Sequence, residues 1–302
     1  MARMRTDYRI GTASWTDPTL LATNFYPSAV ETAEQRLRYY ARCFDTVEVD
    51  STYYALPSER NAALWVERTP ARFRFNIKAY GMLTGHAAEV RSLPKAIKAM
   101  LSPEALEEER LRQPPAAAVD LAFEMFREAL DPLRAAGKLG CVLLQFPPWF
   151  TMRAENEAYV EACRRRLPDD RLAVEFRHAS WLGQRASQTL AWLAARDLAF
   201  VNTDAPSAPS IPQTPFVATG PVAYVRLHGR NREAWFRRAE SAAQRFKYLY
   251  SDVELRECAG RIRELRQVGD GAAGTVYVIF NNCYADYGVR NAQTMQGLLR
   301  GV

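Results

Sequence analysis

The sequence predicts a single (β/α)8 barrel of the TIM type over residues 1–302. Eight short apolar runs alternate with segments of helical periodicity along the whole chain. The runs do not follow one another as hairpins, so their strands are expected to pair in parallel through helical crossovers. One such barrel commonly holds about 300 residues.

Each expected strand is a short apolar run in which β-branched residues are frequent. The fourth is ended by Pro147 and Pro148, which cannot continue a ladder. The predicted strands are residues 8–13, 46–50, 73–78, 140–146, 172–177, 198–204, 223–228 and 275–281.

Helical periodicity follows seven of the eight runs, and Ser58 is the expected N-cap of the second helix. After the sixth run, Pro206, Pro209, Pro212 and Pro215 interrupt the pattern. The sixth helix is therefore expected to be short or replaced by a proline-rich loop. The predicted helices are residues 31–43, 58–68, 119–136, 155–167, 184–196, 251–267 and 291–299.

An open, doubly wound parallel sheet is the alternative architecture. Dinucleotide-binding sheets of that kind carry G-x-G-x-x-G after the first strand. The segment after residue 13 contains no such motif. The closed barrel is therefore the preferred prediction.

Composition restricts the class of protein. Forty basic and 34 acidic residues give a net charge of +6, which modestly favours anionic partners. The five cysteines form no C-x-x-C pair, and no apolar stretch approaches about 18 residues or the core of a signal peptide. We expect a cytoplasmic protein with reduced thiols and no membrane partner.

Polar side chains end almost every predicted strand, and the period of two places alternate residues on one face. In a parallel barrel these residues can face the lumen at the carboxyl ends of the strands, where active sites of this architecture lie. The alternative is a polar network that only fills the barrel. The residues are Glu48, Asp50, Asn76, Lys78, Gln145, Glu175, Arg177, Asn202, Asp204, Tyr224, Arg226, His228, Asn281 and Asn282.

The charges of this group nearly balance, because lysine and arginines stand among the carboxylates. A metal site normally gathers carboxylates and neutral imidazoles without such cations. We therefore expect no metal and no cofactor. A divalent metal remains the alternative, since Glu48, His86, Glu175, Asp204 and His228 are suitable ligand types.

Lys78 is one of five lysines in a chain with 35 arginines. An ion pair with Glu48 or Asp50 is its expected role, and a Schiff base is the alternative. The three histidines, His86, His178 and His228, all follow strands and so lie on the mouth side. We expect His228 to be the acid–base group among them.

Residues 226–250 interleave arginines with aromatic side chains. Phosphate contacts combined with base stacking are typical of single-stranded nucleic-acid binding. The other interpretation is an amphipathic segment whose arginines extend to solvent. A nucleic-acid partner is therefore an alternative to a small ligand.

Eight motifs in order resemble the domain of unknown function 72 family, also called YecE-like. They are GTASW, FYP, TVEVDSTYYALPS, F-x-F-x-x-KA, LLQFPP, VEFRHASW, YVRLHGR and FNNCY-x-x-x-G-x-x-NA. The resemblance implies an eight-stranded α/β barrel and no particular activity. It adds Tyr53, His178 and Trp181 to the candidate binding residues. The family often has Asn where this chain has Asp50, and its usual Thr-His pair is Thr84-Gly85-His86 here.

Together these patterns predict an enzyme, a hydrolase or a lyase, acting on a phosphorylated or otherwise anionic substrate at the barrel mouth. The expected catalytic groups are Glu48, Lys78, Glu175 and His228. The alternatives are a non-catalytic nucleic-acid-binding protein and a metal-dependent phosphodiesterase resembling endonucleases. The expected binding residues are Asp50, Tyr53, Gln145, Arg177, His178, Trp181, Asp204, Arg226, Asn281 and Asn282.

Overall fold

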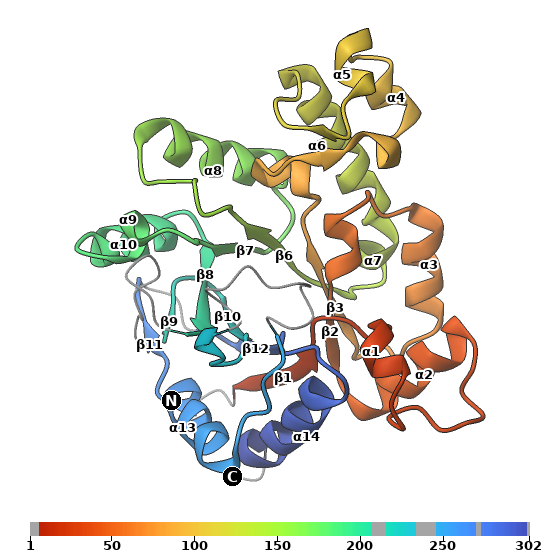
Figure 1. Ribbon diagram of the computed structural model, residues 1–302. Coiled ribbons are helices and arrows are strands. Elements are labelled where there is room, and N and C mark those ends of the chain that lie inside the picture. Colours follow the sequence, from red (N-terminus) through yellow and green to blue (C-terminus); the bar gives the residue numbers. More distant parts are fainter. Residues whose placement is uncertain (1–5, 207–215, 234–245, 270–272, 301–302) are drawn as a thin grey trace.

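Eight parallel strands form one nearly closed barrel sheet with helices between them, a TIM-like (β/α)8 architecture (Figure 1). The computed structural model describes residues 6–206, 216–233, 246–269 and 273–300. The strand order is β1-β12-β10-β8-β7-β6-β3-β2. All eight predicted strands are confirmed within about two residues. They are β1 Asp7–Thr12, β2 Thr46–Val49, β3 Arg74–Lys78, β6 Leu139–Gln145, β7 Leu172–Glu175, β8 Leu198–Asp204, β10 Val222–Leu227 and β12 Thr275–Phe280.

The end strands β1 and β2 meet along a seam that a side chain bridges. The backbone N–H of Thr12 donates to the Tyr40 hydroxyl at 2.9 Å, and that hydroxyl lies 3.3 Å from the carbonyl oxygen of Thr46, which can accept from it. The strands are so close that a Cβ added at Gly11 would lie 2.0 Å from the same carbonyl oxygen. Glycine at position 11 therefore permits the barrel to close.

The helices that cover the barrel follow the predicted pattern with local differences. Thr32 with Gln35 and Ser251 with Glu254 form capping boxes, and Ser58 caps the helix that follows it. The expected helix at 119–136 is two helices, because Pro132 cannot donate a hydrogen bond to continue the first. These helices are α2 Ala33–Cys43, α3 Glu59–Glu67, α6 Ala116–Ala129, α7 Asp131–Ala135, α8 Ala154–Arg166, α10 Ala186–Ala194, α13 Asp252–Arg263 and α14 Tyr287–Arg300.

The helix predicted to reach residue 267 ends at Arg263 instead. The chain then forms a short strand, β11 Arg266–Gln267, which pairs in parallel with β9 Val217–Ala218. Pro209, Pro212 and Pro215, on which the prediction of a missing sixth helix depends, lie outside the described residues.

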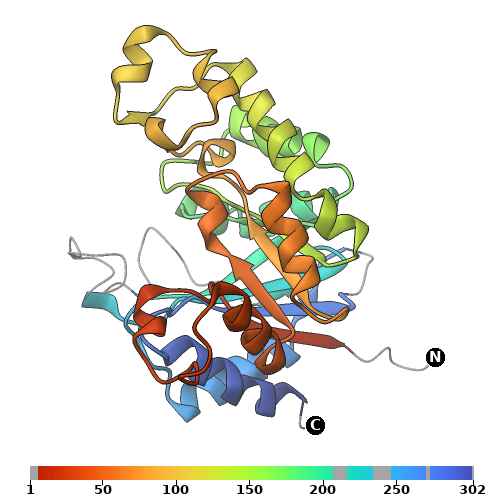
Figure 2. The same cartoon turned by 90° about the vertical axis from the view of Figure 1, so that its right-hand side faces the viewer.

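A long connection between β3 and α6 stands away from the barrel in Figures 1 and 2. Its strands β4 Ala88–Glu89 and β5 Arg110–Leu111 pair in an antiparallel manner. Its other elements are η2 Gly81–Thr84, η3 Val90–Ser92, α4 Lys95–Lys98 and α5 Pro103–Glu107. Three further short helices elsewhere are α1 Pro18–Leu21, η1 Asp50–Tyr53 and α9 Ala179–Leu182.

Two separate apolar clusters fill the fold. The larger packs the outer faces of the strands against the helices, and the smaller lies in the lumen. The lumen cluster is Ala13, Cys141, Leu143, Ala173, Ala199, Val201, Val222, Tyr224, Tyr277 and Ile279. Continuing the alternation along each strand toward its carboxyl end brings Glu48, Lys78, Glu175 and Arg226 into one layer above this cluster.

Among the described residues, no helix is both long and apolar enough to span a lipid bilayer.

Candidate functional site

A buried chain of charges fills the lumen at the carboxyl ends of the strands. Arg226 donates to Glu48 through Nε at 3.1 Å and Nη2 at 2.5 Å, and to Glu175 through Nη1 at 2.7 Å. The Tyr224 hydroxyl donates to Glu48 at 2.8 Å. Arg226 is 1% exposed and both glutamates are 0% exposed. All three guanidinium nitrogens are thus bound to carboxylates, which makes Arg226 the centre of the cluster.

The pKa values of the two glutamates are shifted in opposite directions. Burial raises the pKa of Glu48 to about 7, with Arg226 opposing the effect and Asp50 adding to it. Burial also acts to raise the pKa of Glu175, but Arg177, Arg226 and His228 outweigh it and hold that pKa well below its usual range. Glu175 is therefore ionised near neutral pH, whereas Glu48 titrates there.

His228 lies beside Glu175 and Arg177. Its Nε2 is 3.7 Å from Glu175 Oε1 and 3.5 Å from Arg177 Nη2. The Asn281 amide lies 2.8 Å from Nδ1, so the orientation of that amide sets which ring nitrogen carries the proton. Burial is the main cause that lowers the pKa of His228 to about 4, which makes the ring neutral at pH 7.

Three charged groups of the site are partly exposed. The side chains of Lys78, Arg177 and Asp50 are 15%, 17% and 27% exposed. Lys78 Nζ lies 3.7 Å from Asp50 Oδ1 and 4.6 Å from the centre of the Tyr53 ring. Asp50 is therefore the ion-pair partner of Lys78. Arg177 is held by Glu175, to which its Nε donates.

Gln145 and Asn281 complete the group that the sequence placed at the mouth. The Gln145 amide nitrogen lies 3.4 Å from Glu175 Oε1, and Asn281 contacts His228. Glu48, Asp50, Tyr53, Lys78, Gln145, Glu175, Arg177, Arg226, His228 and Asn281 thus lie together.

Asp204 does not join this site, contrary to the expectation. It accepts two hydrogen bonds from Arg230, at 2.9 and 2.8 Å, and one from the Tyr250 hydroxyl at 2.8 Å. Arg261 of α13 donates to it at 3.3 Å. The lumen face of β8 includes Ala199 and Val201, so Asp204 lies on the opposite face with Asn202.

Asn282 and Trp181 also lie elsewhere. The Asn282 amide donates to Tyr248 O at 2.8 Å and to Asn291 Oδ1 at 2.9 Å, which joins the end of β12 to α14. Trp181 is 0% exposed, stacks on Phe176 at 4.0 Å and donates to Phe150 O. Both side chains therefore lie apart from the cluster around Arg226.

His178 acts locally as the N-cap of α9. Its Nδ1 accepts from the backbone N–H of Ser180 at 3.0 Å and lies 2.9 Å from the Ser180 hydroxyl. Both contacts join His178 to Ser180, two residues further along the chain.

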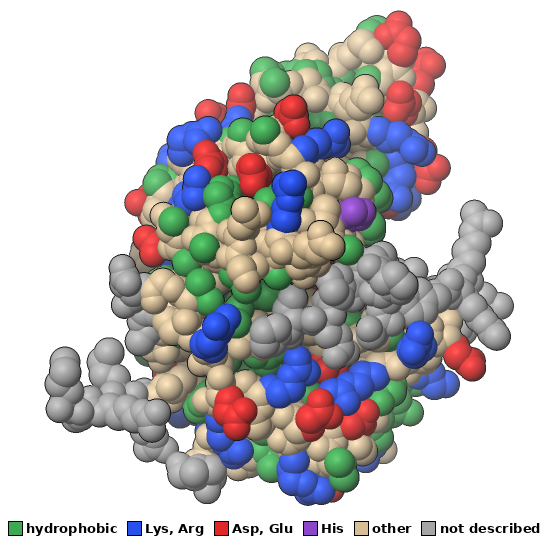
Figure 3. All heavy atoms as spheres, turned by 90° about the vertical axis from the view of Figure 1, so that its left-hand side faces the viewer, with side chains coloured by type: hydrophobic (Ala, Val, Ile, Leu, Met, Phe, Trp, Pro, Cys, Tyr) green, Lys and Arg blue, Asp and Glu red, His purple; other side chains and the backbone are tan. Residues whose placement is uncertain are grey.

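Two arginines in the described part of residues 226–250 are paired with carboxylates of this protein. Arg226 is bound by Glu48 and Glu175, and Arg230 is paired with Asp204 and Glu257. Tyr250 is 3% exposed. Residues 234–245, with Trp235, Phe236, Arg237 and Arg238, lie outside the described residues. Figure 3 shows basic and acidic side chains interspersed on one face of the molecule.

Sequence reasoning missed one exposed aromatic residue near the mouth. Trp149 is 64% exposed, and its ring centre lies 5.9 Å from that of His86. The His86 ring in turn lies 5.2 Å from the Tyr53 ring. The signal in the sequence was the segment Pro147-Pro148-Trp149, which follows a strand and resists inclusion in a helix.

Within residues 6–206, 216–233, 246–269 and 273–300, no three His, Cys, Asp or Glu side chains are grouped so that they could hold a metal ion. The carboxylates Glu48 and Glu175 are bound by Arg226 instead.

Comparison with known proteins gives the family. Residues 9–301 match the family described as "Protein of unknown function DUF72". The UPF0759 protein YunF of Bacillus subtilis (strain 168) is 30% identical over 296 residues, which cover 96% of this chain and 94% of YunF.

Two solved structures are similar in fold. A DUF72 family protein from Enterococcus faecalis V583 is 26% identical with a TM-score of 0.75, covering 97% of this chain and 95% of its own. A DUF72 family protein from Thermotoga maritima MSB8 is 29% identical with a TM-score of 0.73, covering 97% of this chain and 99% of its own. The family match over nearly the whole chain agrees with the ordered motifs, and the protein belongs to the DUF72 family.

Proposed function

We propose that this protein is an enzyme, a hydrolase or a lyase, that binds a small anionic substrate at the carboxyl end of its barrel. The observation that carries the proposal is the position of Lys78 and Arg177, which are partly exposed above the buried chain of Glu175, Arg226 and Glu48. A phosphate or carboxylate accepts hydrogen bonds from such cations with favourable geometry. Active sites of this architecture lie at this end of the barrel.

The energetic cost of the cluster supports a functional role. Removing a charged group from water costs several kcal/mol before pairing, and apolar residues of similar volume often give equal or greater stability. Glu48, Glu175 and Arg226 are fully buried, yet most side chains in the lumen below them are apolar. A barrel selected for stability alone has no need for these charges.

In this proposal the residues have different roles. Lys78 and Arg177 bind the anion, while Arg226 and Glu48 position Glu175, which holds Arg177. His228 is the proposed proton-transfer group, acting at Nε2, the ring nitrogen that faces Glu175 and Arg177. An anion beside Arg177 offsets the positive charge that helps to lower the pKa of His228, which moves that pKa toward neutrality.

Replacing Lys78 by Met is expected to weaken anion binding at the mouth by about tenfold, because it removes the charge and keeps most of the stem volume. Thermal stabilisation by sulfate or phosphate, titrated at constant ionic strength, measures the change. Lys95→Met is the matched control, since Lys95 is an exposed lysine on α4. Equal sulfate stabilisation in wild type and Lys78→Met would contradict the proposed anion site.

Sulfate is expected to bind more tightly as the pH falls from 8 to 6. The pKa of Glu48 is about 7, so protonation in this range removes a negative charge beneath Lys78 and Arg226. In the free protein His86 and His228, each with a pKa of about 4, are neutral throughout this range, and sulfate keeps its charge. Any rise in the pKa of His228 on sulfate binding acts in the same direction as Glu48 and remains in Glu48→Gln. Calorimetric titration at three pH values measures the slope. Glu48→Gln should flatten it, and a pH-independent wild type would contradict the assignment to Glu48.

A further inference from the structure

Three aromatic rings form a continuous row that begins at the proposed anion site. We call Tyr53, His86 and Trp149 the aromatic wall. Lys78 Nζ lies 4.6 Å from the Tyr53 ring centre, Tyr53 is 5.2 Å from His86, and His86 is 5.9 Å from Trp149. The wall therefore extends from a cation at the mouth toward an exposed indole.

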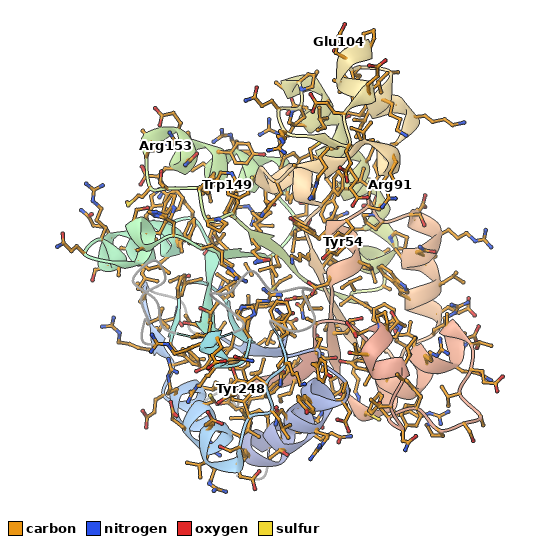
Figure 4. All side chains as sticks on the ribbon, in the orientation of Figure 1. Tyr54, Arg91, Glu104, Trp149, Arg153 and Tyr248 are labelled. Carbon is orange, nitrogen blue, oxygen red and sulfur yellow. The ribbon has the colours of Figure 1, made fainter. Side chains whose placement is uncertain are left out.

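The exposed indole of Trp149 is held by a well-packed loop. Its neighbour Phe150 stacks on Phe146 at 4.1 Å and on Trp181 at 5.9 Å, and the Trp181 indole donates to Phe150 O at 2.7 Å. The backbone is thus anchored in the core while the Trp149 side chain remains 64% exposed. Figure 4 shows Trp149 and Tyr54 above the barrel strands in that view; Tyr54 is 65% exposed and its ring contacts Tyr53.

His86 is suited to be the middle ring of the wall. Burial is the main cause that lowers its pKa to about 4, and the nearby charges of Lys78 and Arg177 add to the effect. The ring is therefore neutral at pH 7. Its Nδ1 lies 2.9 Å from the Thr84 hydroxyl, a contact that orients the imidazole between Tyr53 and Trp149.

We propose that the substrate carries a planar ring next to its anionic group, as a mononucleotide does, and that this ring stacks on the aromatic wall. The inference rests on the proposed function, because Lys78 and Arg177 bind the phosphate. The rings of the aromatic wall can pack against a nucleobase through their faces or their edges. A sugar would require several hydrogen-bonding partners for its hydroxyl groups, whereas the wall offers ring surfaces and an imidazole nitrogen already near Thr84.

Isothermal titration with adenosine monophosphate, ribose 5-phosphate and adenosine tests the proposal. We expect the wild type to bind adenosine monophosphate about tenfold more tightly than ribose 5-phosphate, since stacking on one aromatic ring gives about that factor or more. Trp149→Ala should remove this advantage without changing the affinity for ribose 5-phosphate. Trp149→Phe should retain most of it. Leu106→Ala is the control, because Leu106 is an exposed apolar residue on α5.

The three ligands test stacking on the aromatic wall and anion binding separately. Equal affinities for the two phosphates in the wild type would overturn the wall and support the anion site. Tighter binding of ribose 5-phosphate would overturn a nucleobase as the stacked group. Trp149-dependent binding of adenosine with no gain from phosphate would support the wall and overturn the anion site. Binding of none of the three would overturn both.

Discussion

Replacing Arg226 by Met is expected to lower the free energy of unfolding by about 3–5 kcal/mol at pH 7. Met fills much of the volume but leaves Glu48 without the two hydrogen bonds from Arg226 and Glu175 without one. Both carboxylates are 0% exposed, so water cannot replace the lost partner without opening the barrel. Urea denaturation followed by circular dichroism measures the loss.

Two further variants and a pH series test the cause of that loss. Arg91→Met should change stability by less than about 1 kcal/mol, because Arg91 is 86% exposed beside Glu89. Combining Arg226→Met with Glu48→Gln should recover part of the stability.

The pKa of Glu175 is lowered in the folded state, so its stabilising effect is present above its unfolded pKa of about 4.3 and is lost at lower pH. The difference between wild type and Arg226→Met should therefore shrink in acid. A difference under about 1 kcal/mol at pH 7 would be inconsistent with the buried cluster.

Replacing Gly11 by Ala is expected to destabilise the fold by about 3 kcal/mol, although the substitution adds a single methyl group. The added Cβ would lie 2.0 Å from Thr46 O and 2.8 Å from Thr46 C, both backbone atoms of β2. Relief of this overlap requires β1 to move away from β2. That movement stretches the bridge from Thr12 through the Tyr40 hydroxyl to Thr46. Thermal and urea unfolding measure the effect.

Gly260→Ala in α13 is the matched control. A Cβ at Gly260 meets no heavy atom within 4 Å, and the position is inside a helix, where Ala is favoured over Gly by about 0.5–1 kcal/mol. This variant should therefore be slightly more stable than the wild type. Similar changes in stability for the two substitutions would show that close approach of β1 and β2 at Gly11 is not required for the stability of the barrel.

The sequence alone determined the eight strands and much of the charged cluster at their carboxyl ends. Glu48, Lys78, Glu175 and Arg226 are correctly placed in one layer for two physical reasons. Side chains alternate along a strand, and all strands of a parallel barrel end on the same side. The motif order also identified the family, which the match over residues 9–301 confirms.

Tertiary structure decided which face of each strand points into the lumen when both faces are buried. On β8 the small residues Ala199 and Val201 fill the lumen, and Asp204 turns outward to meet Arg230 and Arg261. The period of two defines two faces but does not say which is inner, because the polar residues of β8 find partners on a loop and on α13.

Long-range contacts also gave the two arginines Arg226 and Arg177 different surroundings. Arg226 reaches Glu48, 178 positions away in sequence, and is neutralised within the cluster, whereas Arg177 extends to the opening. Such pairings depend on the closure of the barrel, which local patterns in a sequence do not contain.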